Sequence, residues 1–128
     1  MIDHVSIGVS NLTDSAEFYD AALGALGMGR QRELPVAIGY GYNRATFWIQ
    51  KSEKSTFRPG VGLHVAIAAS TPESVDAFHA AALTHGGRDG GPPGPRHEYS
   101  SDYYSAFVFD PTGTKVEAVC RNNAPLIT

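Results

Sequence analysis

The chain repeats itself at a spacing of 60 residues, and this repeat constrains the fold more than any other feature. Segments 4–27 and 64–87 align without a gap, and nine of their 24 positions are identical. Two copies are too few for a solenoid, which needs at least three repeats. The 128 residues are also the usual size of one domain. We therefore expect a single domain over residues 1–128, with one module at about 1–55 and a second at about 60–122.

Each copy starts with the pattern of a strand and continues with the pattern of a helix. Residues 5–9 and 63–69 alternate apolar side chains with small or polar ones, which is typical of a half-buried strand. A helix is predicted over about 13–26 in the first copy. In the second copy, the Ser-Thr-Pro-Glu sequence at 70–73 is a helix start signal, and the glycines at 86–87 are a stop signal.

Further strand patterns follow each helix. They lie at about 36–40, 45–50, 103–110 and 115–120. The sequence Asp-Pro-Thr-Gly at 110–113 fits a three-residue hairpin loop between the last two strands. The stretch 86–101 is rich in Gly and Pro and is predicted to be a loop. Each half therefore has a strand, a helix and about three more strands, which predicts an α+β fold with the helices on the outer faces of two half-sheets.

Alternation assigns side chains to the sheet face opposite the helices. His4 and His64 fall on that face at equivalent positions of the repeat, and the hairpin register places Glu117 there across from Phe107. By the same alternation, the face also carries Trp48, Tyr103 and Ser105. A one-residue slip would substitute Tyr104, Ala106 and Val108 for the residues of that strand.

Two imidazoles and one carboxylate suit a divalent transition metal: Fe, Mn, Ni, Co or Zn. Such a set leaves coordination positions open for water or substrate, as a catalytic metal requires. Glu117 also interrupts an otherwise apolar strand. The alternative is that His4 and His64 are ordinary surface or core histidines that make hydrogen bonds and bind no metal.

Five other residues are candidates for contact with a substrate. Trp48 suits either a stacking wall or a packing residue at the mouth of the cavity. Tyr103 suits either a proton donor to a substrate oxygen or a packing residue. Arg96, in the Gly/Pro-rich stretch, suits either a clamp for an anionic group or a solvated side chain. Phe107 and Ser105 would shape the pocket, whereas Cys120 falls on the helix-facing side.

The composition excludes several function classes. The net charge is −3 and there is no basic block, so a nucleic-acid partner is not expected. No apolar run approaches the length of a membrane span, and no signal-peptide pattern occurs at the N-terminus. The single cysteine cannot form an internal disulfide, which fits a reducing cytosol. We expect a cytoplasmic protein that acts on a small molecule.

The chain resembles the vicinal oxygen chelate superfamily, which includes glyoxalase I, bleomycin-resistance proteins and extradiol dioxygenases. The resemblance covers essentially the whole chain, and its most specific block is the strand, Asp-Pro-x-Gly turn and Glu-bearing strand at 106–117. It implies two βαβββ modules in a paired half-barrel, a homodimer, and metal ligands at His4, His64 and Glu117. Trp48 stands where glyoxalase I has a fourth ligand, which argues against glyoxalase I activity itself.

These features together predict a metal-dependent enzyme of dioxygenase, lyase or transferase type. Its metal would bind two vicinal oxygens of a small substrate, with Glu117 and Tyr103 beside the reacting atoms. The alternative is a metal-free, small-molecule-binding protein of the bleomycin-resistance kind. Whether one chain or two would supply each metal site stays open at this stage.

Overall fold

A computed structural model describes residues 1–53 and 58–121 of the chain. Each half contains one strand, one helix and three further strands, in that order. The first half comprises β1 (Val5–Val9), α1 (Leu12–Gly24), β2 (Gly29–Leu34), β3 (Ala37–Gly41) and β4 (Phe47–Lys51). The second half comprises β5 (His64–Ala68), α2 (Pro72–Thr84), β6 (Arg88–Pro95), β7 (Tyr103–Phe109) and β8 (Lys115–Arg121).

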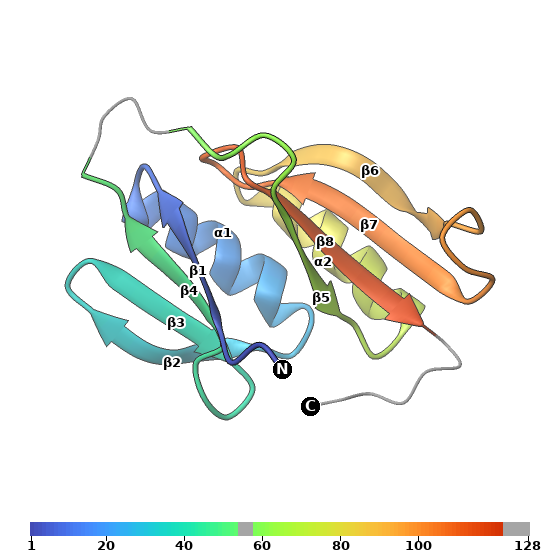
Figure 1. The fold of residues 1–128 in the computed structure, drawn as a ribbon, viewed down its shortest axis with the longest axis horizontal. Coiled ribbons are helices and arrows are strands. Elements are labelled where there is room, and N and C mark those ends of the chain that lie inside the picture. Colours follow the sequence, from blue (N-terminus) through green and yellow to red (C-terminus); the bar gives the residue numbers. More distant parts are fainter. Residues whose placement is uncertain (54–57, 122–128) are drawn as a thin grey trace.

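The two halves have the same sheet topology (Figure 1). The strand order is β1-β4-β3-β2 in the first sheet and β5-β8-β7-β6 in the second. In each sheet the first strand pairs in parallel with the last, and the other pairings are antiparallel. Consequently β1 and β5 each occupy an edge of their own sheet. The predicted α+β fold of two β-α-β-β-β modules is confirmed.

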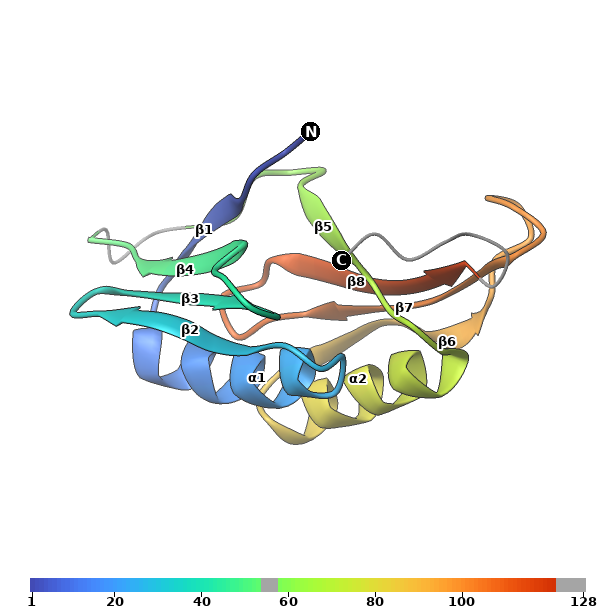
Figure 2. The same cartoon turned by 90° about the horizontal axis from the view of Figure 1, so that it is seen from below.

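Both helices lie side by side on the same side of the two sheets (Figure 2). The apolar face of each sheet packs on them, so one core fills the space between the layers. Ile7 and Val9 are buried there, whereas Ser6 is exposed, as the alternation predicts. On the opposite face of both sheets, the described part of the chain places no helix, and this is the face on which the sequence places the candidate site.

The helix boundaries follow local signals. Asn11 accepts a hydrogen bond from the Asp14 backbone N–H at the start of α1, and Thr71 and Ser74 form a capping box at the start of α2. The predicted start of α2 is therefore confirmed. The first helix ends at Gly24 rather than at 26, and Gly27 follows with a positive φ of 91°.

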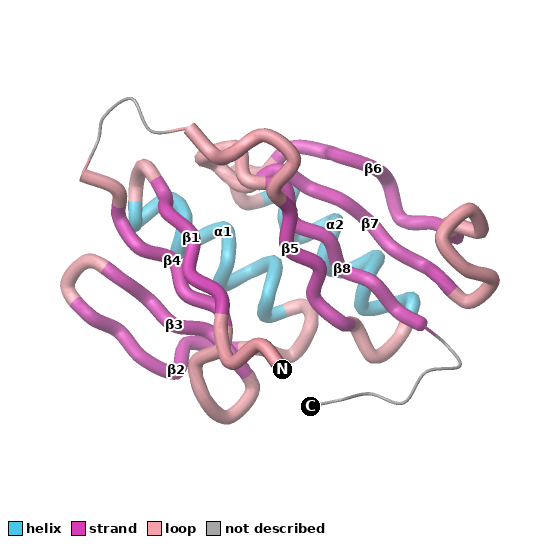
Figure 3. The backbone as a smooth tube through the Cα atoms, viewed as in Figure 1, coloured by secondary structure: helices cyan, strands magenta, loops and turns pink. Residues whose placement is uncertain are grey.

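The stretch 86–101, predicted to be a loop, contains the strand β6 (Figure 3). That prediction is wrong. Gly and Pro are unfavourable inside a sheet, but β6 is an edge strand, where a missing proline N–H need not leave a gap in the ladder. The pairing with β7 shifts register twice, between Asp89 and Gly91 and between Gly91 and Gly94. Pro92 and Pro93 lie at the second of these irregularities, and Pro95 ends the strand.

The modules are joined by contacts of α1 with the β7–β8 turn. The buried Tyr19 hydroxyl donates to Asp110 Oδ2 at 2.7 Å. The other oxygen, Asp110 Oδ1, accepts three backbone N–H bonds, from Thr112, Gly113 and Thr114. Burial raises the pKa of Asp110, and these hydrogen bonds counteract the shift. Asp110 thus holds the predicted hairpin turn and fixes it against the other module.

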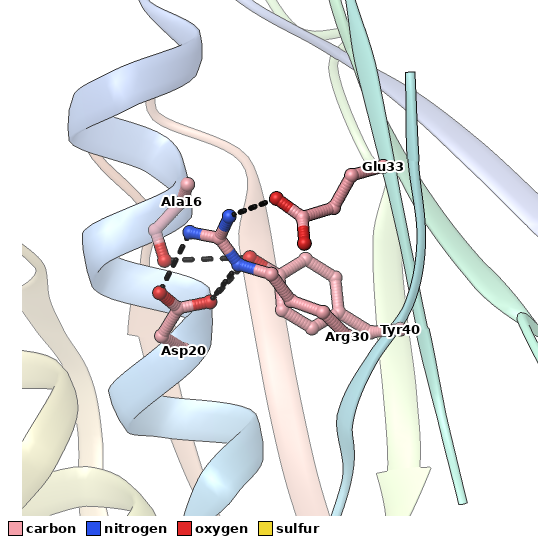
Figure 4. Close-up of polar contacts among 5 residues, drawn as sticks. All are labelled: Ala16, Asp20, Arg30, Glu33 and Tyr40. Atoms are coloured by element: carbon pink, nitrogen blue, oxygen red, sulfur yellow. Dashed lines mark hydrogen bonds and ion pairs between the residues drawn. The ribbon is translucent and has the colours of Figure 1, made fainter. Parts of the chain in front are cut away.

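A polar cluster ties α1 to β2 and β3 in the first module (Figure 4). Arg30 donates to both oxygens of Asp20 at 2.8 Å and to Glu33 at 2.9 Å. The hydroxyl of Tyr40 donates to Asp20 at 2.9 Å. Partial burial acts to raise the pKa of Asp20, but the hydrogen bonds from Arg30 and Tyr40 outweigh it, so that the pKa is lowered.

Asp20→Asn is expected to make the free energy of unfolding depend less on pH in the acidic range. A folded-state pKa below 3.8 means that the ionised carboxylate stabilises the fold above that pH, and that this contribution is lost as the pH falls further. Because Asp20 is about half exposed, the variant should cost less than about 1 kcal/mol at neutral pH. Urea unfolding between pH 7 and pH 3 measures the difference in free energy of unfolding between the wild type and Asp20→Asn. This difference should become smaller as the pH falls, and it should also be smaller when both proteins carry Arg30→Gln. A pH-independent difference would contradict the assignment.

Candidate metal and substrate site

Three polar side chains converge on the helix-free face of the second sheet. His64 lies at the start of β5, Glu117 in the middle of β8 and Tyr103 at the start of β7. His64 Nε2 is 3.2 Å from Glu117 Oε1, and the Tyr103 hydroxyl donates to Glu117 Oε2. Both carboxylate oxygens are therefore held in place, one by an imidazole and one by a phenol.

The strand register explains this convergence. Glu117 pairs with Phe107 on β7, as the hairpin loop at 110–113 predicts, and it also pairs with Ala66 on β5. The loop closes with hydrogen bonds between Asp110 and Thr114, and Gly113 has a positive φ of 107°. The predicted register of Phe107 with Glu117 is confirmed, and Cys120 is buried, in line with its predicted helix-facing position.

A cavity of about 240 Å³ opens over these groups. Burial, with the hydrogen bond to Glu117, raises the pKa of Tyr103 from its ordinary value to about 12. The ring of Phe107 forms part of the wall, 6.0 Å between centroids from the His64 ring. The described residues that line the cavity are His64, Tyr99, Tyr103, Phe107, Lys115 and Glu117.

The donors at this position fit a divalent metal. Glu117 is only 1% exposed, and a buried carboxylate is costly unless cations or hydrogen-bond donors face it. Its partner His64 has a side chain that is 44% exposed, so the imidazole faces the open side of the sheet. One nitrogen and one carboxylate donor suit Fe, Mn, Ni, Co or Zn. Two ligands are fewer than such an ion needs from the protein.

The third predicted ligand, His4, lies elsewhere in the chain. It lies just before β1, where it lines a cavity of about 590 Å³ that reaches β5 residues 65–68. Its Nδ1 is 2.8 Å from Asp3 Oδ1. No group of three His, Cys, Asp or Glu side chains suited to a metal occurs within the described ranges 1–53 and 58–121. One chain thus brings together His64 and Glu117, and His4 stays apart from them.

The predicted substrate contacts are spread over both modules. Trp48 lies on β4 paired with Ser6 and Gly39, and its ring passes so close to Gly39 that a Cβ there would lie 2.9 Å from it. Ser105 is fully buried, and its hydroxyl has no hydrogen-bond partner among the described residues. The Arg96 guanidinium lies 5.6 Å from the centre of the Phe107 ring and donates to the carbonyls of Pro92 and Gly94.

Sequence reasoning missed three residues near these groups. Lys115 and Tyr99 line the cavity over Glu117, and Tyr99 belongs to the Gly/Pro-rich stretch at 86–101. The third is Asp3, which holds the His4 ring. An acidic residue beside a candidate ligand is the signal that could have indicated this last contact, because such ligands are often oriented by carboxylates.

The comparisons with known proteins agree with this architecture. The model of the glyoxalase/bleomycin resistance protein/dioxygenase superfamily matches residues 1–118, so the chain belongs to that superfamily. A glyoxalase/bleomycin resistance protein from Albidiferax ferrireducens is 38% identical, with a TM-score of 0.82 over 93% of this chain and 97% of that one. Among curated proteins, none shows significant similarity to the chain.

More distant structures share the fold. A glyoxalase-related enzyme from Fulvimarina pelagi has a TM-score of 0.80 at 19% identity, covering 100% of this chain and 93% of that one. A glyoxalase I mutant from Zea mays has a TM-score of 0.73 at 25% identity, covering 92% of this chain and 46% of that one. Within the described ranges, none of the helices is both long and apolar enough to cross a membrane.

Proposed function

We propose that this protein is a divalent-metal-dependent enzyme that acts on a small substrate carrying two vicinal oxygens. The observation that carries the proposal is the convergence of His64 Nε2 and the buried Glu117 carboxylate, 3.2 Å apart, in a cavity open to solvent. Membership of a superfamily whose name includes glyoxalases and dioxygenases supports it. A redox-active iron would imply dioxygenase chemistry, whereas Mn, Ni or Zn would imply lyase or transferase chemistry.

The third ligand is His4 of a second copy, so the site belongs to a homodimer. Both β1 and β5 are sheet edges with unpaired backbone groups on one side, which favours pairing with another chain. Exposed apolar side chains flank these edges, among them Ile2 and Leu63. If β1 of one copy lies beside β5 of the other, His4 of the first copy comes next to His64 and Glu117 of the second. The Asp3 carboxylate, bonded to Nδ1, leaves Nε2 of His4 as the free donor.

The residues of this chain have distinct roles in such a site. A bound divalent ion supplies Lewis acidity toward the substrate oxygens. Glu117 and His64 hold that ion, and Phe107 excludes water from one side of the cavity. Tyr103, a protonated phenol at neutral pH, donates a hydrogen bond to a substrate oxygen or to Glu117. Trp48 of the second copy would then wall the cavity from the opposite module.

Metal content measured by plasma mass spectrometry tests this function. Untagged protein purified without chelator should hold close to one metal ion per chain. A His4→Ala/His64→Ala variant should hold about a tenth of that or less, because two of three ligands are removed. A His79→Ala variant is the matched control, since His79 pairs with Asp89 on another surface, and should keep its metal. If the wild-type protein takes up none of the five candidate ions, the metal-free binding function replaces this one.

A further inference from the structure

A second cavity, of about 550 Å³, adjoins the candidate metal site and is lined by basic side chains. It shares His64 and Lys115 with the smaller cavity over Glu117. Arg58 and Arg88 also line it, and none of the described lining residues is Asp or Glu. Basic side chains thus outnumber acidic ones around this cavity, which favours an anionic ligand.

The strand register places these residues in one row across the sheet. His64 on β5 pairs with Lys115 on β8, which pairs with Phe109 on β7, which pairs with Arg88 on β6. Neighbouring strands are about 4.8 Å apart, so Lys115 starts one strand spacing from His64. The next row along the sheet contains Glu117. The basic cavity and the candidate metal site thus lie in adjacent rows of the same face.

The aromatic rings of this face lie beneath the cations. The Arg88 guanidinium is 4.9 Å from the centre of the Phe109 ring, and Lys115 Nζ is 4.6 Å from the centre of the Phe107 ring. Neither Arg88 nor Lys115 makes an ion pair with a carboxylate of the described part of the chain. Their N–H groups therefore remain available to an anion, while the rings offer an apolar floor to a planar group.

We propose that this cavity, between Lys115 and Arg88 over Phe109, binds the anionic end of the substrate, a carboxylate or a phosphoryl group. The assignment deepens the proposed function and rests on it, because it takes the vicinal oxygens to lie at His64 and Glu117. The floor of this cavity, Phe109 on β7, lies two strand spacings from His64 on β5, or about 10 Å. The substrate is therefore a small molecule whose charged group lies about that distance from the chelating oxygens.

Anion binding can be measured on the metal-free dimer in chelator, which separates it from metal binding. The probes are benzoate, its neutral isostere benzamide, and inorganic phosphate, each titrated at low salt and followed by the backbone amide signals of residues 62–64, 88 and 113–115. Benzoate or phosphate should bind at least about 10-fold more tightly than benzamide, because hydrogen bonds to charged groups are the stronger ones. The tighter of the two anions assigns the carboxylate or the phosphoryl group.

A Lys115→Gln/Arg88→Gln variant should bind either anion at least about 10-fold more weakly. An Arg32→Gln/Lys51→Gln variant is matched in charge and lies on β2 and β4 of the other module, so it should bind as the wild type does. Both variants should keep the wild-type metal content and oligomeric state. Equal binding of benzoate and benzamide, or equal weakening in both variants, would overturn the proposal. Loss of the dimer in Lys115→Gln/Arg88→Gln alone would also overturn it, assigning these cations to the subunit interface.

Discussion

Glu117→Gln is expected to lower the affinity for the divalent metal by more than about 100-fold. The loss of a residue that only orients a metal ligand already costs about 10–100-fold, and Glu117 would bind the ion directly. The metal-free variant should unfold within about 1 kcal/mol of the wild type. The reason is that Gln is nearly isosteric and can still accept from Tyr103 while donating to His64.

Calorimetric titration with each candidate ion, together with melting curves with and without it, measures both effects. The wild-type protein should be stabilised by a saturating metal, whereas the variant should not, because only a ligand bound to the folded state raises stability. Tyr103→Phe is the matched control. It removes the phenol that donates to Glu117 but keeps the metal ligands Glu117 and His64, so it should bind the metal within about 10-fold of the wild-type affinity. Wild-type affinity in Glu117→Gln would exclude this residue as a ligand.

Asp110→Ala is expected to destabilise the fold by about 3–5 kcal/mol, the largest stability effect of any single change considered. It removes the acceptor for three backbone N–H groups of the β7–β8 turn and for the buried Tyr19 hydroxyl. The amide of Thr114 and the Tyr19 hydroxyl lie in buried residues, where water cannot replace the lost acceptor. The loss affects both modules, because this aspartate links the hairpin to α1.

Chemical denaturation with two comparison variants tests this expectation. Tyr19→Phe removes one hydrogen bond and keeps the turn, so it should cost about 1 kcal/mol. Asp110→Asn keeps one carbonyl oxygen for the three N–H groups, so its loss of stability should lie between those of Asp110→Ala and Tyr19→Phe. A loss below about 1 kcal/mol for Asp110→Ala would show that the turn is held by other interactions, such as the Gly113 N–H bond to the Asp110 carbonyl.

Much of the fold could be predicted because short-range signals and the repeat agree. The alternation of 5–9 and the capping residues near 71 depend on neighbours along the chain, and the structure confirms them. The Asp-Pro-Thr-Gly turn fixes the register of Phe107 with Glu117. The strand β6 could not be predicted, because its Gly and Pro residues oppose strand formation and only its long-range pairing with β7 determines it.

The candidate site could be predicted from the sequence only in part. Alternation assigns a side chain to a face but says nothing of distance along that face. It therefore placed His4, His64 and Glu117 together, although one chain joins only the last two. The contact of Tyr103 with Glu117 depends on how two strands and two rotamers meet, which no local pattern contains.

The central claim, that each metal site is shared between two copies, is tested most directly by mixing two inactive variants. His4→Ala and His64→Ala are purified separately, shown to lack metal, unfolded together and refolded in equal amounts with the ion that the wild type binds. Half of the dimers are then mixed, and each mixed dimer has one intact site of two. The mixture should therefore recover about a quarter of the wild-type metal content, whereas either variant alone recovers none. A mixture that stays metal-free while the wild type reloads fully would contradict the shared site.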